Sequence, residues 1–234
     1  MKAIPLLIAG IFLSLFCKAQ TDSTQYRKKA FFKTSYDLLQ YRPGELLTGG
    51  GAQLSFVNFS LAAGFYDKKE RNFHEFALSR IYYTNNVHYH TVTDTTGRQM
   101  AEKIGKKKDF GIGFRYEYNL KLGKRNDRKS KFYIGFPVEC YYVRQDFAPL
   151  YANSFNYHVN GFGLVTGVVP RYQYWFTKNF YLDIAIPITM YEGLVSHIKD
   201  SNVNKPVSER NTTDYRSYVG PPFPNFRIGL GIKI

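Results

Sequence analysis

The feature that most constrains this chain is a strict two-residue alternation of apolar and polar side chains. It is clearest between residues 110 and 122, where every even position is apolar or aromatic and every odd position is glycine or polar. A β-strand sends alternate side chains to opposite faces, whereas a helix would spread both sets around its circumference. The stretch therefore predicts a strand with one apolar face. Its apolar positions are Phe110, Ile112, Phe114, Tyr116, Tyr118, Leu120 and Leu122.

The same alternation recurs along the rest of the chain and predicts an all-β protein of about eight strands. It is regular in 132–142, 162–176, 180–190 and 226–234, and it is present with mixed faces in 31–41, 52–66 and 72–85. The uncharged run 46–66 also has the length of a membrane helix. Three consecutive glycines at 49–51 and several polar side chains argue against that alternative.

The connections between these stretches alternate in length. This alternation is typical of an up-and-down barrel in the outer membrane, which has short turns at one end and long loops at the other. We expect the long connections, above all 86–108 and 192–223, to be extracellular loops that form the contact surface. In chain order the predicted connections are 42–51, 67–71, 86–108, 123–130, 146–160, 177–179 and 192–223.

Alternation alone does not say which face of the strands points outward. A soluble barrel such as a lipocalin buries its apolar face, whereas a membrane barrel turns that face toward lipid. Here the apolar faces continue for more than about ten residues, enough for a tilted strand to cross a bilayer. The chain is also 18% aromatic, as expected from aromatic girdles at both membrane interfaces. We therefore predict an antiparallel transmembrane β-barrel, with a soluble lipocalin-like binding barrel as the alternative.

The first 19 residues have the composition of a secretory signal peptide. Lys2 supplies a positive charge, residues 4–16 form an apolar core, and small residues precede a cleavage point between Ala19 and Gln20. The expected organisation is a signal peptide at 1–19, a flexible lead-in at 20–30 and an outer-membrane β-barrel domain at 31–234.

Three segments carry a resemblance to a known family. They are KAQ at 18–20, RYEYNLKLG at 115–123 and FRIGLGIKI at 226–234. On these segments the chain resembles the outer membrane protein β-barrel domain family of Bacteroidota, over most of 31–234. The resemblance implies a small eight-stranded barrel in the outer membrane of a Gram-negative cell, which meets the barrel-assembly machinery during biogenesis.

The polar faces of the predicted strands carry charges that would point into the barrel. Because an eight-stranded barrel is only wide enough to be filled by side chains, we expect these charges to form a structural salt-bridge network. A path for a solute is the alternative. The predicted lumenal residues are Arg115, Glu117, Glu139, Arg171, Asp183, Arg227 and Lys233.

The chain is strongly basic, with a formal net charge of +14. The basic residues gather in short runs between the predicted strands, which does not favour nucleic-acid binding in an exported protein. We expect them to meet anionic lipid headgroups, and the partners to be outer-membrane lipid and lipopolysaccharide. The basic side chains proposed to contact the phosphates of surface glycolipid are Lys103, Lys106, Lys107 and Lys108.

Two groups of residues could have a chemical function, one as a metal site and one as a nucleophile with its base. His88 and His90 share one face of an extended segment, and His158 and His197 lie in other predicted loops, so the spacing permits a metal site at the outer rim. Ser196 precedes His197, as a nucleophile beside a base, but adjacent residues on a strand point to opposite faces. We therefore expect no catalytic residue, metal or cofactor. An ion or small-solute transport barrel and a lipid-modifying outer-membrane enzyme remain the alternatives.

Overall fold

The computed structural model describes residues 29–41, 54–55, 58–67, 71–93, 99–123, 129–149, 155–220 and 225–234. The predicted signal peptide and nearly all of the lead-in lie outside these residues. The described chain is almost entirely β-sheet, with one short helix, α2 (Val207–Arg210). Within this part of the chain, no helix has the length and apolar character needed to span a membrane.

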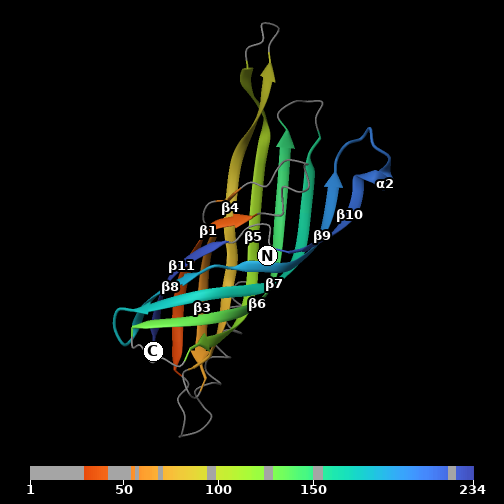
Figure 1. The fold of residues 1–234 in the computed structure, drawn as a ribbon. Coiled ribbons are helices and arrows are strands. Elements are labelled where there is room, and N and C mark those ends of the chain that lie inside the picture. The colour runs from red at the N-terminus through yellow and green to blue at the C-terminus, as the bar shows by residue number, and fades with distance from the viewer. Residues whose placement is uncertain are drawn as a thin grey trace.

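All strand pairings are antiparallel, and they follow the order β10-β9-β7-β6-β5-β4-β3-β1-β11-β8; the ring closes because β11 pairs with β1 and β8 pairs with β7 (Figure 1). β7 pairs with both β8 and β9, while β2 and β3 follow one another against β1. The strand segments therefore form a closed eight-stranded barrel, as predicted. The strands are β1 (Ala30–Tyr41), β2 (Leu54–Ser55), β3 (Asn58–Tyr66), β4 (Phe73–Thr93), β5 (Gln99–Leu122), β6 (Ser130–Pro149), β7 (Tyr157–Trp175), β8 (Phe180–Ala185), β9 (Ile188–Asp200), β10 (Asn211–Val219) and β11 (Phe226–Lys233).

The two faces of this wall are reversed relative to a soluble barrel. Large apolar side chains point outward and are exposed, such as Phe162 at 65% and Phe132 at 56%. Charged side chains point inward and are buried, such as Arg115 at 1% and Glu117 at 0%. The phase predicted from the alternation, with even positions of β5, β6 and β7 outward, is therefore correct.

A bulge in β4 explains why the sequence of this strand has mixed faces. The pairing of β4 with β5 shifts between Ser79 and Tyr82, and Arg80 has a positive φ of 50°. Ser79 and Arg80 are consecutive and yet both are buried. Below the bulge the odd positions point inward, and above it Ile81 and Tyr83 are exposed, so the inward phase changes from odd to even.

Three long connections predicted from the sequence are largely strand, so those predictions were wrong. Most of 86–108 continues β4 and β5, which remain paired from Thr84↔Asp109 up to Thr93↔Gln99. Likewise β9 and β10 occupy much of 192–223, and β6 and β7 occupy much of 146–160. These strands rise beyond the closed part of the barrel, with β4 and β5 reaching furthest (Figure 1). Among the described residues, this end of the barrel therefore consists largely of paired strands.

Candidate functional site

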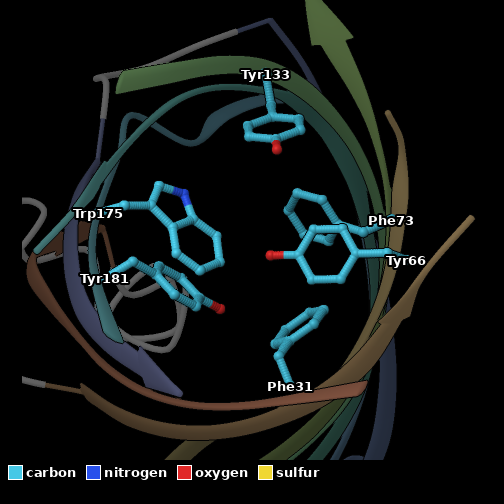
Figure 2. Packing of buried hydrophobic residues seen from close by; sticks show 6 residues of the cluster. All are labelled: Phe31, Tyr66, Phe73, Tyr133, Trp175 and Tyr181. Carbon is cyan, nitrogen blue, oxygen red and sulfur yellow. The ribbon is translucent and has the colours of Figure 1, made fainter. Parts of the chain in front are cut away.

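Six aromatic side chains fill the barrel at the end where β1 begins and β11 ends. Figure 2 shows their rings pointing inward from the surrounding wall. Trp175 and Tyr181 stack with ring centroids 4.6 Å apart, and Phe73 meets Tyr133 edge-on at 4.9 Å. Tyr181 lies so close to Gly231 that a Cβ there would be 2.2 Å from the tyrosine ring. We call this layer the aromatic plug; its members are Phe31, Tyr66, Phe73, Tyr133, Trp175 and Tyr181.

Two lysines lie against the aromatic plug. The Nζ of Lys131 is 4.3 Å from the centroid of the Trp175 ring. The Nζ of Lys233 is 5.3 Å from the centroid of the Tyr66 ring and 5.9 Å from that of Trp175. Lys233 is one of the predicted lumenal residues, and the structure places its Nζ over aromatic rings, where a cation is stabilised by their electron-rich faces.

The next layer of the lumen, beside the aromatic plug, is a cluster of paired charges, which we call the central ion network. Arg171 contacts three carboxylates, with nitrogen-to-oxygen distances of 2.6 Å to Glu117, 2.8 Å to Glu75 and 3.4 Å to Asp183. Four basic and four acidic members are linked in this way among the described residues, so their formal charges cancel. The members are Lys33, Asp37, Glu75, Arg115, Glu117, Arg171, Asp183 and Arg227.

The network joins strands that are distant in sequence. Glu75 of β4 accepts hydrogen bonds from Lys33 of β1, Arg115 of β5 and Arg171 of β7. Asp37 of β1 accepts one from Arg227 of β11, across the closure of the ring. Buried charges are tolerated only when they are paired in this manner. The network therefore ties opposite walls of the barrel together across the lumen.

Five of the seven predicted lumenal residues belong to this network. Glu139 is also buried, but it pairs separately with Arg80, whose Nε lies 2.8 Å from a carboxylate oxygen of Glu139. The guanidinium of Arg80 also lies 3.9 Å from the centroid of the Tyr141 ring. Sequence reasoning missed Lys33, Asp37, Glu75 and Arg80.

Outside the barrel, the register shows where the apolar surface ends. One row of outward neighbours across five strands is apolar or aromatic: Ile112, Tyr142, Phe162, Val195 and Tyr215. The next row outward is mixed: Phe110, Arg144, Asn160, His197 and Thr213. The row beyond is polar: Lys108, Asp146, His158, Lys199 and Asn211. The apolar surface therefore gives way to a charged one within about two rows.

Asp146 accepts hydrogen bonds from two neighbouring side chains in the mixed and polar rows, Arg144 and His158. Arg144 donates from Nε to both of its carboxylate oxygens, at 3.1 and 3.0 Å, and His158 donates from Nδ1 at 2.6 Å. Partial burial acts to raise the pKa of Asp146, but the hydrogen bonds from His158 and Arg144 outweigh it and hold that pKa below its usual range. Asp146 therefore stays ionised and keeps Arg144 in place at the rim.

The four lysines proposed to contact glycolipid do not share one face. Lys106 and Lys108 are exposed on the outer face of β5. Lys107 has the opposite phase, with only 12% of its side chain exposed and its Nζ 3.7 Å from Asp109. The side chain of Lys103 lies outside the described residues. Lys107 therefore points away from Lys106 and Lys108, because a paired strand sends adjacent residues to opposite sides. The contact of these lysines with glycolipid stays a prediction.

The chemical constellations considered from the sequence lie apart where the structure describes them. Ser196 is buried and faces the lumen, whereas His197 is on the outer face, 3.3 Å from the hydroxyl of Thr213. The side chains of His88 and His90 lie outside the described residues. Over the rest of the described chain, no three metal-ligating side chains gather.

The sequence matches no protein-family model and no curated protein. Among solved structures it is similar to a major outer membrane protein from Thermus thermophilus, with 11% identity, a TM-score of 0.48, and coverage of 89% of this chain and 100% of that one. It is also similar to the outer membrane protein OprG from Pseudomonas aeruginosa, with 15% identity, a TM-score of 0.46, and coverage of 89% and 97%.

Proposed function

We propose that this protein is an integral outer-membrane β-barrel with a structural or interaction role, exerted through the strands that rise beyond its membrane belt. The observation that carries the proposal is the exposed apolar belt around a closed wall with a charged interior. In hydrocarbon every backbone N–H and C=O needs an internal partner, and a closed barrel supplies one without exposing an edge. Exported soluble barrels have no such reason to turn Phe132 and Phe162 outward.

The dimensions of the belt support this location. On β5 the outward apolar positions run from Phe110 to Leu122. Twelve steps of about 3.3 Å give roughly 40 Å along the strand, or about 30 Å along the axis at a tilt near 40°. That height is close to the thickness of a bilayer's hydrocarbon core, about 30 Å.

The filled lumen supports a scaffold role over the transport alternative. The aromatic plug and the central ion network occupy successive layers, and the network leaves no excess charge to attract an ion of one sign. We also propose that the protein is not an enzyme. The placement of Ser196 and His197 on opposite faces of β9 supports this, because a base must reach its nucleophile. Surface glycolipid and, during biogenesis, the barrel-assembly machinery are the proposed partners.

Planar-bilayer recording tests the scaffold role against transport. We expect the purified barrel, inserted in a folded and heat-modifiable form, to give no stepwise conductance, because the plug and the network block the aqueous path. An open porin added to the same chamber controls for detection. Steady unitary openings from several independent preparations would instead support the transport barrel.

A further inference from the structure

We propose that the outer face of β5, β6, β7, β9 and β10 binds an anionic glycolipid, with a phosphate of its headgroup held by Lys108, Arg144 and Lys199 and an acyl chain lying in a groove below them. This proposal rests on the proposed function, since it requires the apolar belt to lie in a membrane. It adds a defined site, which the sequence did not reveal.

The headgroup part of the site is a basic rim assembled by strand register. Lys108 and Lys199 lie in the same outward row, with Asp146 and His158 between them on β6 and β7. Arg144 lies one row closer to the belt, directly beside Phe110 in the register. All three basic side chains are exposed. No acidic residue other than Asp146 belongs to these two rows, so the described rim is basic.

Arg144 is suited to bind a phosphate. Asp146 engages its Nε, which fixes the plane of the guanidinium, while half of the Arg144 side chain remains exposed. An arginine held in this way presents its outer edge to an anion without losing further side-chain freedom, and planar guanidinium groups bind phosphate oxygens in pairs. Asp146 thus acts as a support for Arg144.

The chain-binding part is a groove of about 600 Å³ on the same strands, directly below the rim. Gly193 of β9 is among its lining residues and contributes no side chain, and Phe162 and Leu164 of β7, Val195 of β9 and Tyr215 of β10 also line it. Its exposed lining is mostly apolar. A groove of this kind fits a hydrocarbon chain.

The spacing of the two parts favours one amphiphilic occupant. Gly193 lies four residues below His197 on β9, and outward rows two residues apart are separated by about 6.6 Å along a strand. Gly193 in the groove is therefore about 13 Å along the strand from the row of Arg144. A polar headgroup attached to an acyl chain spans this distance across a membrane interface. A free anion would leave the groove unexplained, and a water-soluble protein partner would not reach a groove at the depth of the belt.

The test measures lipid binding to the folded barrel in detergent micelles by native mass spectrometry. The probes are diphosphoryl lipid A and the same lipid after enzymatic removal of both phosphates. We expect the wild-type barrel to prefer the phosphorylated lipid by about tenfold or more, since each basic side chain near an anionic surface contributes a severalfold gain. Equal binding of the two lipids would overturn the proposal without any variant.

Two variants locate the site. The triple variant Lys108→Ser, Arg144→Ser and Lys199→Ser should lose the preference for phosphate. A control with the same charge change at the opposite end of the barrel, Lys29→Ser, Lys121→Ser and Lys178→Ser, should keep it. The groove variant Gly193→Leu should weaken binding of both lipids severalfold, because the new side chain fills the groove and displaces the flexible ring of Tyr191.

Each outcome separates this inference from the proposed function. All variants are first shown to be folded by a heat-dependent gel shift. If the rim triple binds phosphorylated lipid as well as the control triple does, the site is wrong even though the protein resides in the outer membrane. If the wild-type protein is not found in the outer membrane, the proposed function itself fails.

Discussion

Replacing Arg171 with methionine should destabilise the barrel by about 3–5 kcal/mol, the cost of removing one partner from a buried ion pair. Methionine keeps most of the length of the side chain, so the lost volume is small. What changes is charge: Glu75, Glu117 and Asp183 lose their shared guanidinium, and the network is left with an excess negative charge. Trp175 is the chain's single tryptophan and lies in the plug, so its fluorescence reports unfolding in urea.

Two comparisons show whether charge pairing is the cause. Adding Glu117→Gln to Arg171→Met restores the balance of charges, so the double variant should be less destabilised than Arg171→Met alone. Arg144→Met removes an exposed arginine and should cost less than about 1 kcal/mol. If Arg171→Met and Arg144→Met lowered the free energy of unfolding by equally small amounts, charge pairing in the central ion network would not stabilise the barrel.

Replacing Tyr181 with alanine should also cost about 3–5 kcal/mol, as expected for truncating a fully buried aromatic side chain. Its ring stacks on Trp175 and lies against Gly231, so the cavity would open in the centre of the aromatic plug. Because this substitution alters the surroundings of Trp175, the folded fraction is best measured as the band that keeps its compact mobility on a gel across a urea series.

Phe176 provides the matched control for Tyr181. It is five residues away in sequence, but its side chain is on the outer face and 51% exposed. Phe176→Ala should therefore cost about 1.5 kcal/mol or less in detergent, since the surrounding apolar molecules fill the space that the ring leaves. Equal losses for the two variants would mean that the plug is not a packed core.

The alternation predicted the barrel and much of its interior because each strand has an exposed apolar outer face and a polar inner face, so its residues must alternate between the two. On β5 and β7 the odd positions give Arg115, Glu117 and Arg171 directly, and the structure places all three inside. The inward face of β1 could have been found in the same way, since exposed Phe32 and Tyr36 alternate there with Lys33 and its inward neighbours.

The inward position of Arg80 could not be predicted from the alternation. A bulge puts Arg80 and Ser79 on the same side of β4, and strict alternation places them on opposite sides. Bulges depend on local backbone conformation, here a positive φ at Arg80, which leaves no periodic signal in the sequence. The partner of Glu139 could therefore not be identified from strand phase alone.

The strands above the belt were missed for a different reason. Beyond the rim at Lys108, both faces of β4 and β5 can meet water, so neither face has to be apolar. The period-two pattern of hydrophobicity then disappears, although backbone pairing continues up to Thr93↔Gln99. A prediction from hydrophobic periodicity assigns the polar stretches 86–108 and 192–223 to loops, because that periodicity depends on burial and the hydrogen bonds of a ladder do not.

The central claim, a closed barrel that resides in the outer membrane with its apolar face toward lipid, is tested most directly by cell fractionation followed by a heat-modifiability gel. We predict that the full chain is recovered in the outer-membrane fraction, resists extraction with carbonate, and changes mobility when it is boiled before electrophoresis. A soluble periplasmic protein whose mobility does not depend on boiling would contradict the account. It would mean that the exposed apolar face is covered by something other than lipid.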